Sequence, residues 1–513
     1  MTVVIDPSFN PVPSLSREVA VAVSADAEGA AAIAVFVTAE GELPAEVPAQ
    51  IDRDALAAAG FAGKPGQTLA LPGSPLTVLV GTGDGVETAA QLRDAVAAFT
   101  RAARESSSIA VDLSATVEKG AVSVETAAQA ATEGAILARY RYDALKGDPK
   151  TVQLEHLTLV LSGVAGKAAE AAEIGVERGL ILARTASLAR DLGNTPPRHL
   201  SAVKFAEIVE KLAPQFGLEV EVFDRQQLIE LGTGGLLGVN AGSIEEPRMI
   251  KIRYTPENAT DQTAHLALVG KGIMYDSGGI SLKPSNAMHA AMKLDMMGAA
   301  AVFASMTSLR ELGATTAVTG WLMCTDNMPS GSATKLGDVL TIRGGKTVEV
   351  KNTDAEGRLV MADALVLATE EERRPDAIID IATLTGAAMM ALGTKTAATL
   401  SNNDEIAAQL QAAADATDEN IWRMPLDHRY REQLKSEVAD LSNIGGQYAG
   451  VILAALFLNE FVDGLPWGHV DIAGTMQAES DELWRSAGST GFGARLLAEF
   501  ATAFEAPVKD EDR

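Results

Sequence analysis

The sequence predicts an α/β protein with a smaller N-terminal domain and a larger C-terminal domain whose central sheet is mostly parallel. Three observations support this fold class. The chain has 513 residues, which at roughly 150 residues per domain allows more than one domain. Short β-rich runs alternate with segments of helical periodicity in both halves of the chain. A long charged, alanine-rich helix ends at the segment NTPP (194–197), because proline disfavours helical backbone in the residue before it.

The expected elements follow in order along the N-terminal half. Apolar runs predict strands at 20–26, 31–39, 76–83 and 154–163, and periodic segments predict helices at 87–106 and 123–145. The segment from Ala165 to Leu192 predicts the long helix. We therefore expect an N-terminal α/β domain at 1–165, a linking helix at 166–193 and a C-terminal domain at 194–513.

The C-terminal half repeats the alternation. Strands are expected at 218–224, 248–254, 265–273, 315–324, 347–351 and 376–382, and helices at 287–311 and 357–372. This order is typical of a mostly parallel sheet with helices on its faces.

Composition narrows the possible functions. Asp and Glu outnumber Lys and Arg by 68 to 42, and the net charge of −26 disfavours nucleic-acid binding. The single cysteine, Cys324, excludes a disulfide framework and a cysteine-based metal cluster, and it fits a reducing compartment. The chain has no signal-like N-terminus and no apolar run near the ~20 residues of a membrane span. We expect a cytoplasmic protein that does not associate with membranes.

Several common functional motifs are incomplete or absent in this sequence. GTGDGV (81–86) follows a predicted strand, but Val86 stands where a dinucleotide-binding loop needs its third glycine. GGKT (344–347) has Leu340 at the first glycine position of a phosphate-binding loop. A GxSxG motif is absent, and the six histidines show no HExxH or HxH spacing. Nucleotide-dependent, serine-hydrolase and histidine-ligated zinc chemistry are therefore disfavoured.

Charged residues gather between Lys271 and Arg358. A predicted apolar strand ends in glycine-rich backbone that carries Lys271, Asp276 and Lys283. Open α/β sheets bind ligands beyond the carboxyl ends of their strands, so this is a suitable place for a site. A solvated surface loop is the alternative interpretation of these three residues.

Asp295 is a single carboxylate within an apolar stripe. On the predicted helix it shares a face with Met292, Ala299 and Val302. A buried ionised carboxylate without a partner is strongly unfavourable, so Asp295 needs a cation, a metal or strong hydrogen bonds. The alternative is a structural ion pair with a lysine or arginine.

Asp354 and Glu356 follow the predicted strand at 347–351. If the backbone stays extended, alternation puts both carboxylates on one side, together with Arg358. The alternative is a helix N-terminus decorated with acids, which leaves Arg358 unexplained.

These segments together contribute four carboxylates, which are Asp276, Asp295, Asp354 and Glu356. Four such groups can bind two divalent cations, and oxygen ligation favours manganese, magnesium or zinc. Two ions that share a water molecule favour hydrolysis as the chemistry. The residues alone do not indicate which bond is cleaved.

The octapeptide NTDAEGRL (352–359) resembles the signature of the leucyl (cytosol) aminopeptidases, a family of dinuclear metallopeptidases. Other segments that match this family in order are NTPP (194–197), GKGIMYDSGGISLKP (270–284), MKLDMMGAAAV (292–302), DNMPSG (326–331), GDV (337–339), ATLTGA (382–387), ADLSN (439–443) and VDIAGTM (470–476). The resemblance covers essentially all of the second domain, whereas the first domain matches only in its α/β character.

The resemblance implies two divalent ions per subunit, Mn²⁺ or Zn²⁺, held by Lys271, Asp276, Asp295, Asp354 and Glu356. Asp276 and Glu356 would bridge the ions. A lysine binds metal only as a neutral amine, so the ion must lower the pKa of Lys271. Lys283 would stabilise the oxyanion, and Arg358 would anchor a bicarbonate that serves as general base.

The implied activity is removal of amino-terminal residues, preferentially leucine and other apolar residues, by a metal-bridged hydroxide. The substrates would be peptides with a free N-terminus. Their side chains would enter a pocket formed by Met292, Thr383, Gly386, Ala473 and Met476, for which plain core packing is the alternative. Family members assemble as homohexamers. Two other functions stay open: a different dinuclear hydrolase such as a phosphoesterase, and a catalytically altered member that acts as a DNA-binding or scaffold protein.

Overall fold

The computed structural model describes residues 9–508, which form two compact units. The N-terminal unit comprises residues 9–187 and a later segment, Ala478–Ala487, and the C-terminal unit comprises residues 188–477 and 488–508. The division falls within helix α5 (Lys167–Asn194). Within residues 9–508, no helix is both long enough and apolar enough to cross a membrane.

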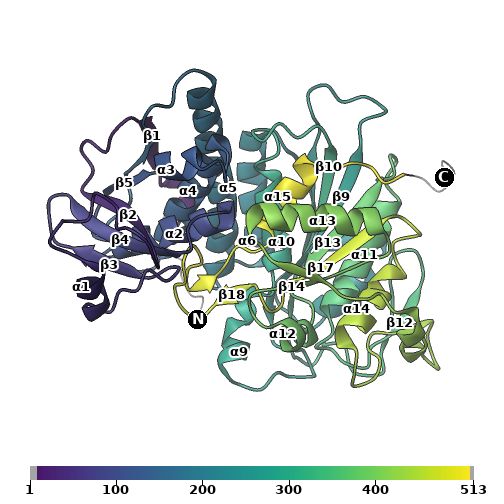
Figure 1. Cartoon of the computed structure of the whole chain (residues 1–513). Helices are drawn as coiled ribbons and strands as arrows, with labels where there is room; N and C mark the ends of the chain where they lie inside the picture. The colour runs from purple at the N-terminus through teal and green to yellow at the C-terminus, as the bar shows by residue number, and fades with distance from the viewer. Residues whose placement is uncertain (1–8, 509–513) are drawn as a thin grey trace. The chain divides into compact units, whose positions relative to one another are not determined.

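A six-stranded sheet forms the centre of the N-terminal unit, with the strand order β1-β6-β5-β2-β4-β3 (Figure 1). The strands are β1 (Ala20–Ser24), β2 (Ala32–Thr38), β3 (Thr68–Leu71), β4 (Leu76–Gly83), β5 (Ser108–Asp112) and β6 (His156–Val160). Neighbouring strands are parallel except for β3, which pairs antiparallel with β4 at one edge. The carboxyl ends of five strands therefore lie at the same edge of this sheet.

The faces of this sheet are covered unequally. Helices α2 (Ala89–Ala102), α4 (Val124–Arg139) and α5 bury one face, because their alanine-rich stripes pack against residues such as Val80 and Ile109. On the other face a smaller core joins β2 and β4 to Leu56 of α1 (Arg53–Ala58) and to Phe61. The remaining short helices of this unit are η1 (Pro13–Ser16) and α3 (Ser114–Glu118).

The C-terminal unit has an eight-stranded sheet with the order β15-β14-β17-β13-β9-β10-β8-β7. Its strands are β7 (Glu219–Phe223), β8 (Arg248–Tyr254), β9 (His265–Asp276), β10 (Ala317–Asn327), β13 (Ala377–Ala382), β14 (Ala397–Ser401), β15 (Ile421–Arg423) and β17 (Trp467–Asp471). The four central strands β17, β13, β9 and β10 are parallel. Short strands elsewhere are β11 (Val339–Thr341), β12 (Thr347–Glu349), β16 (Leu441–Ser442), β18 (Gln477–Ala478) and β19 (Gly488–Ser489).

Helices pack on both faces of this second sheet. They are α6 (Ala202–Leu212), η2 (Ala213–Phe216), α7 (Arg225–Leu231), α8 (Gly234–Asn240), α9 (Ala287–Ala290), η3 (Ala291–Leu294), α10 (Met297–Met306), α11 (Gly357–Thr369), α12 (Gly386–Leu392), α13 (Asp404–Thr417), η4 (His428–Leu434), α14 (Gly450–Asn459) and α15 (Ala494–Thr502). Val269 of β9 belongs to a core with α8, α11 and α14. Its neighbour Gly270 faces α10, where an added Cβ would come within 2.7 Å of Ala299 Cα. The sheet is therefore buried on both sides.

The predicted helix at 287–311 is wrong as a single element. The structure divides it into α9, η3 and α10, and Asp295 lies in the break between η3 and α10 with φ −71° and ψ 2°. Apolar residues continue through the break, so the periodicity alone does not reveal it. The predicted extended backbone at 352–356 is also wrong, because β12 ends at Glu349 and Asp354 lies in a turn before α11.

Candidate active site

Strand β9 contributes two of the predicted site residues. Lys271 lies within this strand and Asp276 is its last residue, and both are 2% exposed. The alternative of a solvated surface loop is therefore wrong for these two residues. The carboxyl ends of β9, β13 and β17 meet at one edge of the parallel sheet, so Asp276 faces the loops that follow the other two strands.

Two lysines each connect carboxylates from different segments. The Nζ atom of Lys271 lies 2.9 Å from Oδ2 of Asp295 and 2.8 Å from Oε1 of Glu356, and it donates a hydrogen bond to the carbonyl of Thr383. The Nζ atom of Lys283 lies 2.8 Å from Oδ2 of Asp276 and 2.6 Å from Oδ1 of Asp354. All four predicted acids and both lysines therefore come together.

Burial and neighbouring charge act in opposite directions on these groups. Burial lowers the pKa of Lys271, but the carboxylates of Asp295 and Glu356 outweigh it and leave that pKa above its usual value. Burial raises the pKa of Asp295 and of Glu356, and the ammonium of Lys271 opposes both increases. In this arrangement Lys271 is an ammonium ion, and only an additional positive charge beside it would favour the neutral amine.

The donor set fits hard divalent cations. Carboxylate oxygens of Asp276, Asp354 and Glu356 lie within 4.8 Å of one another. Oε2 of Glu356 and Oδ2 of Asp295 are buried and accept no hydrogen bond from the described residues, although Lys271 lies close to the latter. Buried carboxylate oxygens without hydrogen bonds are unfavourable unless a cation approaches them. Oxygen ligands in this number are those that manganese and magnesium prefer.

Sequence reasoning missed one side chain that orients the acids. Asn327, the last residue of β10, donates hydrogen bonds to Oδ1 of Asp276 at 2.8 Å and to the carbonyl of Thr353 at 3.0 Å. Thr383, which was predicted as a pocket residue, also donates to Oδ1 of Asp295 at 2.7 Å. Asn327 lies in the DNMPSG segment that carries the family resemblance, which was the only signal for it in the sequence.

Arg358 is in the first turn of α11 and is buried. Its Nη1 donates to the carbonyl of Asn443 at 2.8 Å, and its Nε makes no hydrogen bond within the described residues. Burial lowers the pKa of Arg358 to about 10, although Glu356 and Asp471 oppose the decrease.

A cavity of about 220 Å³ opens beside the acids. Eleven of the twelve predicted site residues line it, which are Lys271, Asp276, Lys283, Met292, Asp295, Asp354, Glu356, Thr383, Gly386, Ala473 and Met476. Arg358 is the predicted site residue that does not. The cavity walls also include Met288, Leu384 and Met389, so one side of the space is apolar.

A further buried carboxylate fixes the apolar side of the cavity. Asp471, the last residue of β17, is 1% exposed. Its Oδ1 accepts hydrogen bonds from the backbone N–H groups of Leu384, Thr385 and Ala473, and its Oδ2 accepts from the Thr385 hydroxyl at 2.7 Å. Asp471 thus connects the two loops that carry the pocket residues. In the sequence, the only signal for Asp471 was its place in the VDIAGTM segment.

Comparison with known proteins decides the family. Residues 187–498 match the catalytic domain of the cytosol aminopeptidase family, and residues 33–149 match the N-terminal domain of the same family. The chain belongs to the cytosol aminopeptidase family. The family membership predicted from the sequence is therefore confirmed, and so is the two-domain α/β fold class.

Relatives of this chain are similar to it in sequence or in structure over most of its length. The chain is 42% identical over 476 residues to a "Probable cytosol aminopeptidase" of Streptomyces coelicolor, covering 87% of this chain and 89% of the relative. A solved structure of "Bottromycin maturation enzyme BotP in complex with Mn" is 38% identical with a TM-score of 0.82, covering 93% and 99% of the two chains. A tomato leucine aminopeptidase mutant is 30% identical with a TM-score of 0.83, covering 95% and 97%.

This family membership makes the protein a metal-dependent aminopeptidase, a hydrolase that acts on peptides. The predicted enzyme class is confirmed. The alternative of a catalytically altered DNA-binding or scaffold protein finds no support among these matches.

Proposed function

We propose that this aminopeptidase holds two divalent ions, Mn²⁺ or Zn²⁺, and removes leucine and other apolar residues from the free N-termini of peptides. The observation that carries this proposal is the convergence of four carboxylates and two lysines on one cavity with an apolar side. A phosphoesterase would need a surplus of donors for phosphate, whereas four acids outnumber two lysines in this cavity.

The ligands would divide between two ion positions. We assign Lys271, Asp276, Asp295 and Glu356 to the first ion, and Asp276, Asp354 and Glu356 to the second, with the main-chain carbonyl of Asp354 as a further ligand of the second. Support comes from the short distances between the oxygens of Asp276, Asp354 and Glu356. It also comes from Oε2 of Glu356, which accepts no hydrogen bond from any described residue. Bound ions would supply Lewis acidity and lower the pKa of a water molecule.

The charged side chains outside the ligand set have separate roles in this proposal. Lys283 stabilises negative charge that develops on the carbonyl oxygen of the scissile bond. Arg358 anchors bicarbonate as a general base, for which the support is a buried guanidinium whose Nε has no hydrogen bond among residues 9–508. Asp295 accepts hydrogen bonds from the amino group of the substrate, which selects free N-termini.

Specificity would come from the apolar side of the cavity. Met292, Ala473 and Met476 offer dispersion contacts to a leucine side chain but no partner to a charged one. We therefore propose poor cleavage after an amino-terminal aspartate.

The family resemblance also supports assembly as a homohexamer in the cytoplasm. Several large apolar side chains of the C-terminal unit are exposed, namely Ile244, Met390, Trp422, Val438 and Tyr448. Contiguous apolar patches mark interaction surfaces, so subunit contacts would cover those of these side chains that lie together. Sedimentation velocity tests this proposal, because a species of about 53.4 kDa would contradict it.

One experiment separates peptidase from phosphatase activity. Purified protein loaded with Mn²⁺ is assayed against leucine p-nitroanilide and p-nitrophenyl phosphate at equal concentration. We expect turnover of the anilide alone. Turnover of the phosphate ester together with no turnover of the anilide would overturn the proposed function.

Asp295→Asn should abolish most activity and leave the folded protein without metal about as stable as before. The carboxylate is buried beside Asp276 and Glu356, so its removal relieves repulsion, and Lys271 keeps its partner Glu356 at 2.8 Å. We expect the free energy of unfolding in urea with a chelator to change by less than about 1 kcal/mol. A decrease of about 3 kcal/mol or more would identify Asp295 as a structural partner of Lys271 instead.

Asp471→Asn should loosen the substrate pocket. An asparagine retains one acceptor oxygen but places an amide where the carboxylate accepts further hydrogen bonds, so the loops at Thr385 and Ala473 lose part of their anchor. We expect KM for leucine amide to rise about tenfold with a smaller change in kcat. Thr385→Val removes the hydroxyl bond to Asp471 and the bond from the Ala388 N–H at the start of α12, but it leaves the carboxylate and its backbone donors in place. It is the matched control and should have a weaker effect. A loss of kcat at constant KM would show that Asp471 acts on the chemistry instead.

A further inference from the structure

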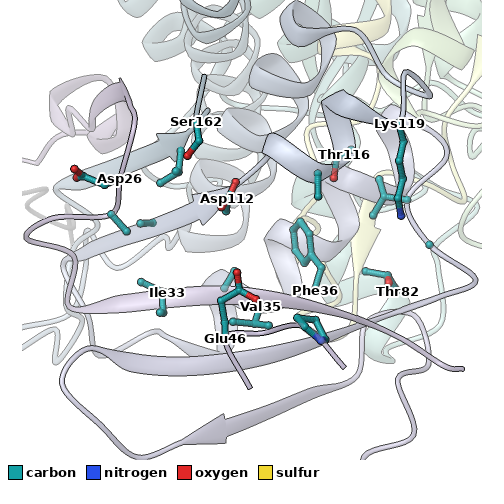
Figure 2. A pocket seen from close by; sticks show the side chains of 18 of the residues that line it. Asp26, Ile33, Val35, Phe36, Glu46, Thr82, Asp112, Thr116, Lys119 and Ser162 are labelled. Carbon is teal, nitrogen blue, oxygen red and sulfur yellow. The ribbon is translucent and has the colours of Figure 1, made fainter. Parts of the chain in front are cut away.

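A second cavity, of about 410 Å³, lies within the N-terminal unit (Figure 2). Its floor is formed by apolar side chains that include Ile33, Val35 and Phe36 of β2. It is nearly twice the volume of the cavity beside the four acids. Nothing in the proposed peptidase chemistry uses it.

The cavity lies where the strand order of the sheet reverses. After β2 the chain passes to β3 and β4 on one side of that strand, and after β4 it crosses to β5 and then β6 on the other side. Residues at the carboxyl ends of β2, β4 and β5, or one residue before the end, line the cavity, namely Thr38, Thr82 and Asp112. In open α/β sheets, such a switch point at the carboxyl ends of the strands is where ligands bind.

Two threonines that line the cavity point to a polar ligand. Thr82 and Thr116 are buried as residues, each 8% exposed, and neither side chain makes a hydrogen bond within residues 9–508. Their hydroxyl groups are not enclosed by protein atoms, so both can hydrogen-bond to a molecule in the cavity. Figure 2 shows Phe36 close to both of them in the view.

The charged groups define the ligand further. Oδ1 of Asp112 accepts a hydrogen bond from the N–H of Ser114 at 2.8 Å, and Oδ2 accepts none within the part of the chain that the structure describes. Figure 2 shows Asp26 at one end of the cavity and Lys119 at the other, with Asp112 and Glu46 between them. Three carboxylates against one lysine repel polyphosphates and favour a molecule rich in hydrogen-bond donors.

The glycine-rich loop GTGDGV (81–86) takes part in this cavity through Thr82, Gly85 and Val86. A dinucleotide-binding loop uses its third glycine for close packing of the helix beside the pyrophosphate, and Val86 replaces it. The loop therefore has the position of a nucleotide-binding loop without the features that hold a diphosphate.

We propose that this cavity binds a nucleoside. The vicinal hydroxyls of the ribose donate to the carboxylate of Asp112, and the base packs on the apolar floor beside Phe36. Thr82 and Thr116 hydrogen-bond to polar edges of the ligand. This site is independent of the proposed two-metal chemistry, since all of its residues belong to the N-terminal unit.

Isothermal titration calorimetry on the full-length, Mn²⁺-loaded protein tests the proposal. The probes are adenosine, guanosine, cytidine and uridine, with the 2′,3′-dideoxy analogue and the 5′-diphosphate of each, and leucine amide, for comparison. We expect at least one nucleoside to bind, and we expect its dideoxy analogue and its diphosphate to bind about tenfold more weakly or not at all. Equal binding of that nucleoside and its dideoxy analogue, or no nucleoside binding at millimolar concentration, would overturn the proposal.

Variants locate the site. Asp112→Asn and Thr116→Val should each weaken nucleoside binding, whereas Asp84→Asn should not, because Asp84 lies on the glycine-rich loop at 81–86 but does not line the cavity. All three should retain the melting temperature and the leucine amide turnover of the parent, which verifies folding. Unchanged nucleoside affinity in Asp112→Asn would contradict the assignment. If leucine amide competes with the nucleoside, and if its binding is lost in Asp112→Asn, the cavity is instead a binding site for amines.

Discussion

Removal of divalent cations should lower leucine amide hydrolysis by about a thousandfold or more. Four carboxylates around one cavity supply acceptor oxygens but no electrophile, and the two lysines beside them are already engaged in ion pairs. The measurement is an initial rate after exhaustive chelation, followed by titration with Mn²⁺, Zn²⁺ or Mg²⁺. We expect full recovery near two equivalents of the preferred ion.

Two results would contradict this prediction in different ways. Hydrolysis at the undiminished rate after chelation would remove the acids from the chemistry altogether. Full recovery at one equivalent would retain the metal but reject the two ion positions assigned above. Circular dichroism during chelation is the control, because it separates loss of metal from loss of fold.

Blocking the substrate amine should have an effect of similar size. We expect kcat/KM for N-acetyl-leucine amide to fall about a thousandfold below that for leucine amide, because the scissile bond loses its orientation in the cavity. Acetylation delocalises the lone pair that an ion would bind, and it removes one of the two N–H groups that would donate hydrogen bonds to Asp295. Comparable kcat/KM values for the two substrates would show that the enzyme does not require a free amino terminus.

A matched substrate isolates the pocket from the amine site. Aspartate amide has a free amino group but a charged side chain, which finds only apolar neighbours at Met292 and Met476. Efficient cleavage of aspartate amide would reject the apolar pocket and leave the amine requirement intact.

The sequence alone predicts the chemistry of the site more accurately than it predicts the local backbone structure around the site. The acids and lysines were found from residue type and family motifs, and the structure brings them together. Asp295 was expected on a continuous helix because apolar residues recur through 287–311, but the chain breaks there. A period in the sequence reports which residues are buried, and a break that buries the same residues leaves that period unchanged.

The side chains that sequence reasoning missed act through the backbone of distant segments. Asp471 accepts N–H groups from Leu384 and Thr385, about ninety residues earlier, and Asn327 contacts Asp276 across neighbouring strands. Such partners are set by strand order, which the pattern of apolar residues does not encode. The N-terminal cavity was missed for a similar reason. Its glycine-rich loop fails the fingerprint, and the strand reversal beside it appears only in the fold.

The return of Ala478–Ala487 to the N-terminal unit has a consequence for fragments of this protein. Trp484 is 1% exposed because it packs with Leu137, Ala183 and Ala186, and Arg101 binds the carbonyl of Arg485 at 2.6 Å. A chain truncated after residue 187 would lack this indole, and a chain that starts at 188 would present it to solvent. Neither half is therefore a self-sufficient product of limited proteolysis, and expression of the catalytic part alone calls for replacement of 478–487 by a short polar turn.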